Sequence, residues 1–162
     1  MGNSMVNNSI DMYDIKTFDK KEDMYKSYEV AKLLNPTMSE DSYKSVIDRI
    51  TSTSNYKQHV VMHDDKVVSM IATQDVLMMG NAPKMTCKLD NVATLPEYRG
   101  YVTSMLMNRV IDTIKKQDYG GVCLDCSKRN EKGTSFYTRM GFEPTNNGWV
   151  MKINSDDRQK EL

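Results

Sequence analysis

The sequence has few cysteines, no excess of charge of either sign and no long apolar run. Its three cysteines are an odd number and too few for a disulfide scaffold. The 22 basic and 22 acidic residues cancel, so no net field favours nucleic acid or an anionic membrane surface. The longest apolar runs span only a few residues, whereas a membrane-spanning helix needs about 20. These absences exclude a transmembrane role, and we expect a soluble protein.

The first residues carry no familiar targeting signal. The basic, apolar and small-residue segments of a secretory leader do not open the chain. Gly2 follows the first methionine, but Val6 stands where a myristoylation signal has Ser or Thr. Together with the small number of cysteines, this start predicts a protein of the reducing cytoplasm.

The chain does contain enough apolar residues for one core. Its 162 residues and 18.6 kDa suit one domain of ordinary size. Apolar residues make up 39% of it, at a mean hydropathy of −0.61. We expect a mobile N-terminal arm over residues 1–10, a single folded domain over residues 11–153 and a charged tail over residues 154–162.

The first third of the chain has the apolar spacing of a short strand followed by two helices. Alternation over residues 13–18 predicts the strand, and helical spacing predicts helices over 20–34 and 39–52. Thr37 and Glu40 have the spacing of a capping box before the second helix. The expected apolar stripes are Met24, Tyr28, Ala31 and Leu34 in the first helix and Tyr43, Val46, Ile47 and Ile50 in the second.

The middle of the chain changes to an alternation of period two, which is typical of strands. Strands over 59–63, 67–78 and 84–94, separated by turn-forming residues, predict an antiparallel meander. An amphipathic helix that ends near Gln117 and a mostly apolar segment over 121–126 follow. A strand, helix, strand order requires a parallel, right-handed crossover, so the last pair of strands is expected to be parallel.

The end of the chain predicts a short helix over 133–140 and a final strand or hairpin over 142–153. The order of elements indicates an α/β fold with a mixed central sheet. Its N-terminal part is expected to be antiparallel and its C-terminal part parallel, with about four flanking helices.

The alternation of the strand over 84–94 slips at its end. Apolar residues occupy one face up to that point, but the next residue on this face is Asn91, and Val92 falls on the polar face. Such a slip is typical of a β-bulge, which bends a strand and leaves backbone groups unpaired for a ligand. The alternative is that Asn91 is simply an asparagine tolerated near the end of a regular strand, and the sequence favours neither interpretation.

A second feature follows in the loop before the amphipathic helix. Arg99 and Gly100 precede a first turn that contains no acidic residue. Backbone N–H groups at such a start carry the positive end of the helix dipole and can hold phosphate oxygens, with glycine allowing close approach. A solvated arginine beside an ordinary turn glycine is the alternative.

These features together resemble the GNAT acyl-CoA N-acetyltransferases. The resemblance rests on LPEYRG, the following helix, VCLDC and FYTRMGF, and it covers about residues 84–153. The pyrophosphate loop of that family usually reads Arg or Gln, two residues, Gly, one residue, Gly or Ala. Arg99 takes the first position, whereas Val102 and Ser104 stand at the usual small residues. The resemblance implies acetyl-CoA as co-substrate and no metal.

Within this superfamily, LDC, a later Asn and FY one turn ahead of GF are similar to the glucosamine 6-phosphate N-acetyltransferases. This resemblance implies acetyl transfer to the amine of glucosamine 6-phosphate, a step in the synthesis of UDP-N-acetylglucosamine, by a cytoplasmic homodimer. Two alternatives stay open: a GNAT enzyme for another small amine or a protein amine, and a catalytically degenerate module that binds coenzyme A.

The same resemblance implies roles for single residues. Asp90 and Asp125 would contact the substrate and accept or orient its amine proton, and Tyr137 would donate a proton to the departing thiolate. Lys128 and Arg129 are candidates to bind the substrate phosphate. The implied acetyl-CoA site comprises Asn91, Val92, Ala93, Thr94, Arg99, Gly100, Tyr101, Val102, Thr103, Ser104, Asn130 and Tyr137.

Several of these residues also fit purely structural roles. Tyr137 in a short helix fits a packed aromatic residue, and Asp125 fits a cap for the loop that follows it. Cys123 and Cys126 form a CxxC pair, but residues three apart in a strand point to opposite faces. We therefore expect thiols here rather than a metal site, and we expect no metal at the two histidines.

Overall fold

The computed structural model describes residues 12–77, 79 and 83–145. The chain divides into two compact units, Met1–Cys126 and Ser127–Leu162, and each is described by itself. The first unit contains the whole of the described sheet. The second unit contains one described helix, α5 (Glu131–Arg139).

The first unit is built on a five-stranded sheet with the order β1-β2-β3-β4-β5. Its first four strands are antiparallel neighbours, and β5 runs parallel to β4. This arrangement confirms the predicted mixed sheet and its parallel C-terminal pair. The strands are β1 (Asp14–Phe18), β2 (Lys57–His63), β3 (Lys66–Val76), β4 (Met85–Thr94) and β5 (Tyr119–Leu124).

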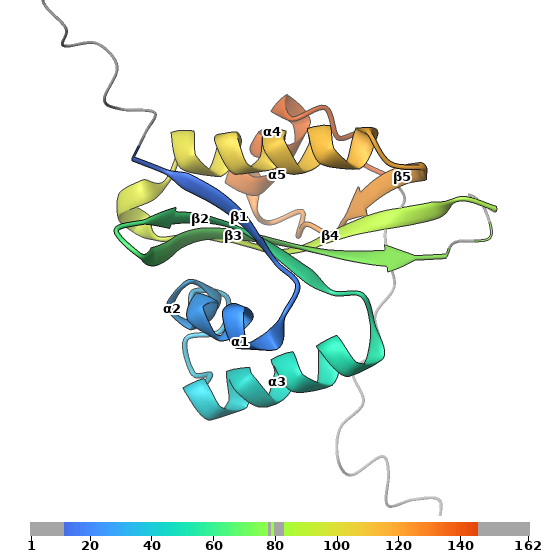
Figure 1. The fold of residues 1–162 in the computed structure, drawn as a ribbon. Helices are drawn as coiled ribbons and strands as arrows, with labels where there is room; N and C mark the ends of the chain where they lie inside the picture. The colour runs from blue at the N-terminus through green and yellow to red at the C-terminus, as the bar shows by residue number, and fades with distance from the viewer. Residues whose placement is uncertain (1–11, 78, 80–82, 146–162) are drawn as a thin grey trace, which may run out of the picture. The chain divides into compact units, whose positions relative to one another are not determined.

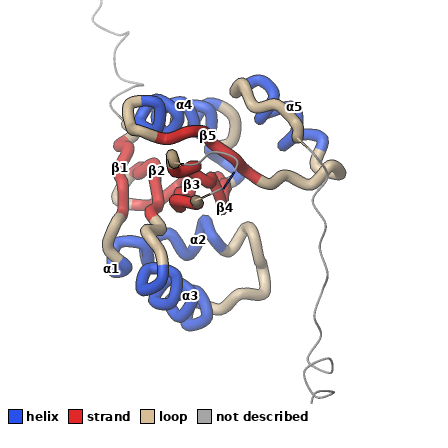
Figure 2. Tube along the Cα trace, turned by 90° about the vertical axis from the view of Figure 1, so that its right-hand side faces the viewer, coloured by secondary structure: helices blue, strands red, loops and turns tan. Residues whose placement is uncertain are grey.

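Helices cover both faces of this sheet. Three short helical segments and α3 lie on one face, and α4 lies on the other (Figure 1), as the turned view also shows (Figure 2). The central strand β3 is therefore buried along most of its length. The helical elements of this unit are α1 (Lys21–Met24), η1 (Tyr25–Ser27), α2 (Tyr28–Ala31), α3 (Glu40–Thr53), η3 (Pro96–Tyr98) and α4 (Tyr101–Lys115).

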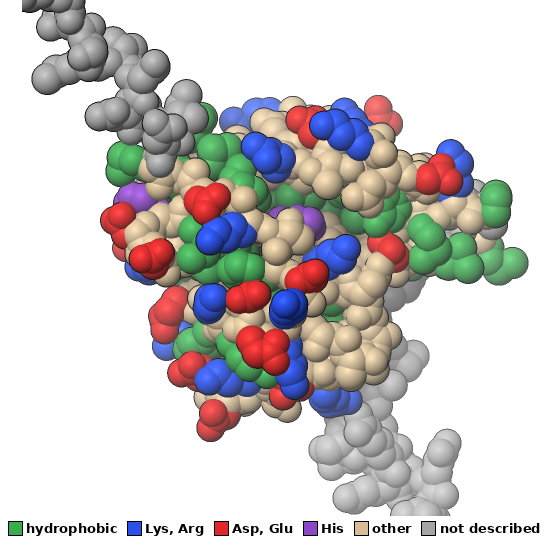
Figure 3. Space-filling view, viewed as in Figure 1, with side chains coloured by type: hydrophobic (Ala, Val, Ile, Leu, Met, Phe, Trp, Pro, Cys, Tyr) green, Lys and Arg blue, Asp and Glu red, His purple; other side chains and the backbone are tan. Residues whose placement is uncertain are grey.

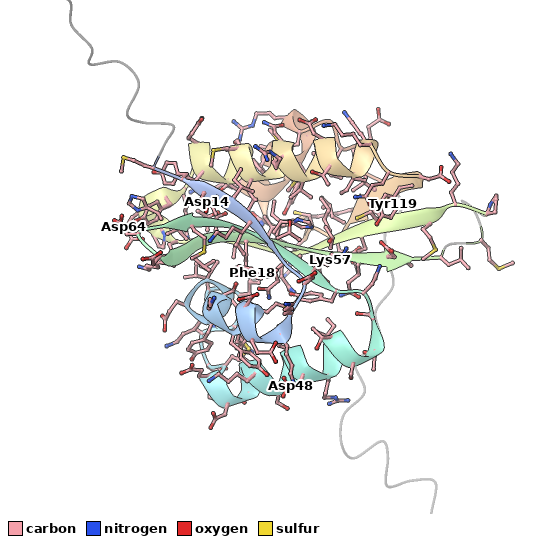
Figure 4. All side chains as sticks on the ribbon, viewed as in Figure 1. Asp14, Phe18, Asp48, Lys57, Asp64 and Tyr119 are labelled. Carbon is pink, nitrogen blue, oxygen red and sulfur yellow. The ribbon has the colours of Figure 1, made fainter. Side chains whose placement is uncertain are left out.

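Apolar side chains from both helical layers meet the sheet. Leu106 and Val110 of α4 are buried, as the helical spacing predicts. Phe18, at the end of β1, is buried between the sheet and the layer of α1–α3 (Figure 4). Met24 and Ile47 are also buried and belong to the core on this side of the sheet. The sheet is thus packed on both sides, which fixes the positions of its strand ends.

The prediction of one continuous helix over 20–34 is wrong. The chain forms α1, η1 and α2 in succession and leaves helical structure after Ala31. Leu34 is consequently 50% exposed instead of completing the apolar stripe. Val46 of α3, which was expected in the second stripe, is also exposed, because Tyr43 and Ile47 already form the buried face.

The cap predicted for the second helix is also different. Ser39, and not Thr37, precedes α3 as its N-cap, and its hydroxyl accepts a hydrogen bond from the backbone N–H of Ser42 at 3.1 Å. Thr37 instead donates to the side chain of Asn35. This local turn holds Thr37 outside the helix, which leaves the later serine to satisfy the first N–H groups.

The far end of the β3–β4 hairpin is apolar and exposed. Leu77 is 65% exposed and Met79 is 95% exposed. Hydrophobic side chains gather at this end of the hairpin in the space-filling view (Figure 3). Exposed apolar side chains that cluster in this way are typical of contact surfaces.

Several predicted segments lie outside the described residues. They are the arm over 1–10, the tail over 154–162 and most of the final strand expected over 142–153. Residues 142–145 are described and are not a strand. In the described ranges, no helix combines the length and the apolar character that crossing a membrane requires.

Candidate active site

β4 contains a β-bulge close to its end. The register with β3 shifts by one residue there, so Asn91 and Val92 together oppose a single β3 residue. Asn91 has a φ of 50°, in the left-handed region that asparagine enters more readily than most residues. The bulge predicted from the slip in alternation is therefore confirmed. The pairs on either side of it are Met70–Ala93 and Ala72–Asp90.

β4 and β5 diverge next to this bulge. Their parallel pairing ends at Leu89–Leu124, while β4 continues to Thr94. At the other end of the pair, the hydroxyl of Tyr119 donates to Asp75 of β3 at 2.6 Å and ties the start of β5 to the sheet. The labelled side chain of Tyr119 marks this end (Figure 4). The diverging ends leave main-chain groups of β4 available to a ligand.

The link from β4 to α4 is held by side-chain hydrogen bonds. The hydroxyl of Thr94 lies 2.7 Å from that of Ser69 on β3 and 2.7 Å from that of Thr103 on α4. Gly100 is the N-cap of α4 and has a φ of 95°, which glycine adopts without a Cβ penalty. The start of α4 is thus fixed relative to the bulged strand.

The N-terminus of α4 is suited to an anion. In the described structure no side chain caps it, and its first turn contains no acidic residue. The N–H groups of residues 101–103 precede the first intrahelical bond, in which Ser104 N–H donates to Gly100 C=O at 3.2 Å. Arg99 is exposed beside them. Val102 is buried, so its side chain packs into the core and does not cover these N–H groups.

Two carboxylates directly follow the last β4–β5 pair. Asp90 is the next residue on β4, and its Oδ1 accepts the backbone N–H of Asn91 at 3.0 Å. Asp125 is the next residue after β5, and it is exposed. The structure therefore brings both predicted acids to the end of the sheet where the strands part.

Lys88 is a charged group at this site that the sequence analysis missed. Its Nζ lies 3.1 Å from Oδ2 of Asp125. Lys88 and Asp90 are two residues apart on β4, so their side chains share a face. The hydrogen bond to Asp125 raises the pKa of the Lys88 ammonium and keeps it charged. In the sequence, Lys88 is one of several polar residues on an alternating strand. This pattern does not distinguish a lysine at a functional site from a lysine that is only exposed to solvent.

Tyr56, immediately before β2, was also missed. Its buried hydroxyl accepts a hydrogen bond from Nδ2 of Asn91 at 3.0 Å. Burial raises the pKa of Tyr56, so the phenol remains protonated. The two residues are 35 positions apart, and no local pattern connects them.

The second unit contains the remaining predicted residues. Tyr137 is half-buried on α5, and its ring packs against Phe136 and Phe142 at centroid distances of 5.4 Å and 6.0 Å. Asn130 is the N-cap of α5, because its Oδ1 accepts the N–H of Gly133 at 2.9 Å. Lys128 and Arg129 are exposed in the preceding loop. The bulge, the start of α4 and the two carboxylates come together in the first unit, while these four residues belong to the second.

The cysteines do not form a disulfide within the described residues. Cys87 is buried, and Cys123 and Cys126 are half-buried. Among the described side chains, no three His, Cys, Asp or Glu group together as metal ligands.

The fold and the sequence both match known acetyltransferases. The model of the acetyltransferase (GNAT) family matches residues 22–142. A putative acetyltransferase from Agrobacterium tumefaciens is 19% identical, with a TM-score of 0.74 over 86% of this chain and 99% of that one. The aminoglycoside N-acetyltransferase AAC(6')-Iy, solved with CoA, is 17% identical, with a TM-score of 0.73 over 87% and 94%.

A third similar structure has a different acceptor in its name. It is glucosamine-6-phosphate N-acetyltransferase from Arabidopsis thaliana, at 15% identity and a TM-score of 0.68 over 88% of this chain and 99% of that one. At these identities the structures show a shared fold. No curated protein matches the sequence significantly. Since the family model spans well over half of the sequence, this chain belongs to the GNAT family of acetyltransferases, which use acetyl-CoA as the acyl donor.

Proposed function

We propose that this GNAT enzyme transfers the acetyl group of acetyl-CoA to the amine of glucosamine 6-phosphate. The observation that carries the proposal is the position of Asp90 and Asp125, which directly follow the last β4–β5 pair beside the bulge. An amine acceptor is protonated at neutral pH and must lose a proton before it attacks, and carboxylates at this point can accept it. The series LDC, Asn, FY and GF supports this acceptor.

Acetyl-CoA supplies the acetyl group as a thioester. The N–H groups at the start of α4 and the guanidinium of Arg99 bind the pyrophosphate. A backbone N–H near Val92 donates to the thioester carbonyl oxygen as negative charge develops on it. The amine attacks directly, with no covalent enzyme intermediate, and the prepositioning of two bound reactants contributes much of the rate.

Asp90 is the base in this proposal, and Asp125 orients the acceptor. Oδ2 of Asp125 is already engaged by the ammonium of Lys88, which holds this carboxylate at the end of β5. Asp90 lies on β4 directly beside the bulge, where its Oδ1 accepts the backbone N–H of Asn91. Tyr137 is the proposed donor to the departing thiolate, since the ordinary pKa of a phenol is about 10, comparable to that of a thiol.

The acceptor phosphate is assigned to basic residues near the end of β5. Lys128 and Arg129 are exposed and follow β5 closely in the chain. The proposed enzyme is a homodimer, so a second subunit can add further cations. The exposed apolar end of the β3–β4 hairpin supports such a contact surface.

A different amine is the second candidate acceptor. Asp90 and Asp125 place two negative charges against the single positive charge of Lys88, and this balance favours a polycationic acceptor. The similarity to aminoglycoside acetyltransferases is consistent with such a molecule. A degenerate module that binds coenzyme A without turnover is the third candidate.

The test is release of free thiol from acetyl-CoA with a panel of acceptors. Glucosamine 6-phosphate and glucosamine form a matched pair that isolates the phosphate, and an aminoglycoside, a polyamine and a lysine peptide complete the panel. We expect the highest kcat/KM with glucosamine 6-phosphate. A preference for glucosamine or for a polycation would support the second candidate. Binding of coenzyme A without turnover of any acceptor would support the third.

A further inference from the structure

Two buried tyrosines and a glutamine connect the β-bulge to the helical layer. The hydroxyl of Tyr56 accepts hydrogen bonds from Nδ2 of Asn91 at 3.0 Å and from Nε2 of Gln58 at 3.3 Å. Gln58 also donates to the hydroxyl of Tyr43 at 3.0 Å. The hydroxyl of Tyr43 donates to the main-chain oxygen of Met24 at 2.8 Å. One chain of hydrogen bonds thus runs from the bulge to the end of α1.

This chain of hydrogen bonds lies in the protein interior. Tyr43 and Tyr56 are each 4% exposed, and Gln58 is fully buried. A further buried atom, Oε1 of Gln58, has no partner among the described residues. Burying a polar group without a hydrogen-bond partner costs free energy. Each hydrogen bond of this network therefore favours the observed position of its donor.

The hydrogen bond between Tyr56, which precedes β2, and Asn91 of β4 spans the strand β3. Ala72 of β3 pairs with Gln58 on one side and with Asp90 on the other, so all three side chains share one face. Ala72 contributes only a methyl group to this face.

We propose that Tyr56 is a positioning residue of the acetyl-CoA site, acting through Asn91. Its hydroxyl anchors the Asn91 amide and thereby holds residue 91 at a φ of 50°. That conformation keeps the main chain of Asn91 and Val92 out of regular pairing with β3, where it can bind the thioester. The inference rests on the proposed acetyl-CoA site at the bulge and is independent of which amine is the acceptor.

Tyr56→Phe removes the anchor and retains the ring. We expect the Kd for acetyl-CoA, measured by isothermal titration calorimetry, to rise about tenfold, because the bulge then samples conformations that do not bind. The matched control is Tyr43→Phe, which removes a hydroxyl of equal burial that is bonded to the same Gln58 but does not contact the bulge. This control is expected to lower the melting temperature by a similar amount and to leave the Kd within about twofold.

A second comparison separates positioning from general destabilisation. Asn91→Gly retains access to positive φ but removes the amide that Tyr56 holds. If Tyr56 acts through Asn91, adding Tyr56→Phe to Asn91→Gly causes no further loss of acetyl-CoA affinity. This double variant removes the Asn91 amide together with its acceptor, so it also serves if Tyr56→Phe alone fails to fold.

Two results would overturn the inference. One is an unchanged Kd in Tyr56→Phe, and the other is an equal loss of affinity in Tyr43→Phe. A native protein that does not bind acetyl-CoA at all would remove the proposed site, and the inference with it. A negative acceptor panel combined with the expected Kd changes would overturn the proposed reaction alone.

Discussion

Lys88 and Asp125 form an ion pair, 3.1 Å from Nζ to Oδ2, between the two strands whose pairing ends one residue later. The pair joins β4 to the residue that follows β5, at the point where the strands diverge. Lys88 also shares a face of β4 with Asp90. Three charges therefore meet at one place, and the ion pair distinguishes Asp125 from Asp90, although the two carboxylates look equivalent in the sequence.

The first prediction concerns these carboxylates. Asp90→Asn is expected to lower kcat by about 100-fold or more, because it removes the proposed base. Asp125→Asn is expected to have a smaller effect on kcat and to act on the KM of the acceptor, since Asp125 already pairs with Lys88 and is the proposed orienting group. Steady-state thiol release measures both values, and calorimetry should show an unchanged Kd for acetyl-CoA. Equal losses of kcat would contradict the division of roles.

The second prediction tests the charge of Lys88. With Lys88→Gln we expect the KM of a phosphorylated acceptor to rise about tenfold, because the freed Asp125 then repels the phosphate. Lys84→Gln is the matched control, since Lys84 forms a similar pair with Asp118 at 3.0 Å near the other end of β4. Exposed pairs of this kind contribute under about 1 kcal/mol to stability, so both variants should melt near the native temperature. A similar KM change in the control would show that the effect is not local.

The third prediction concerns Tyr137. Tyr137→Phe is expected to lower turnover and leave the affinity for acetyl-CoA nearly unchanged, because only the proton donor is lost. The ring contacts with Phe136 and Phe142 are retained by phenylalanine, which keeps the packing of α5. An unaffected rate would remove Tyr137 from the mechanism and leave it as a packed aromatic residue.

The fourth prediction concerns stability at low pH. Burial, with a smaller effect of Lys57, lowers the pKa of His59 from 6.5 to about 4. The unfolded chain therefore binds more protons than the folded one between these values, and stability falls as the pH drops through this window. We expect this histidine to account for about 2 kcal/mol of the loss between pH 7 and pH 5, and for none above the unfolded pKa.

The measurement is urea unfolding of the native protein and of His59→Gln at both pH values. The variant should lose less stability on acidification, because its neutral side chain takes up no proton. The variant also loses the hydrogen bonds of the His59 ring nitrogens with the hydroxyls of Thr17 and Thr73. For this reason we compare only the change in the free energy of unfolding between the two pH values. Identical pH dependence in His59→Gln and the native protein would contradict the assignment.

Much of the fold could be predicted because it follows from local alternation. The meander, the parallel β5 and the bulge at Asn91 are all confirmed by the strand register. Periodicity did not predict the division of the first helix, because the spacing of Leu34 fits a continuous helix although the chain leaves helical structure after Ala31. The cap is ambiguous for a similar reason, because Thr37 and Ser39 are both N-cap residue types and only the fold shows that Ser39 caps α3.

The candidate site was predictable only where it is local in sequence. Asp90, Asn91 and Gly100 follow one another within a single strand and loop. Tyr56 and Lys88 gain their importance from partners that are distant in the sequence, Asn91 on β4 and Asp125 after β5. Contacts of this kind depend on the register between strands, which the pattern within one strand does not contain.

The open start of α4 has a practical consequence for any assay of this enzyme. Its N–H groups and the neighbouring Arg99 form the proposed pyrophosphate site, and such a site recognises a charge and an oxygen geometry that inorganic sulfate and phosphate share. We therefore expect buffers that contain these ions to compete with the nucleotide end of the donor and to raise its apparent KM. Affinities obtained in chloride at low ionic strength will therefore be tighter than those obtained in phosphate.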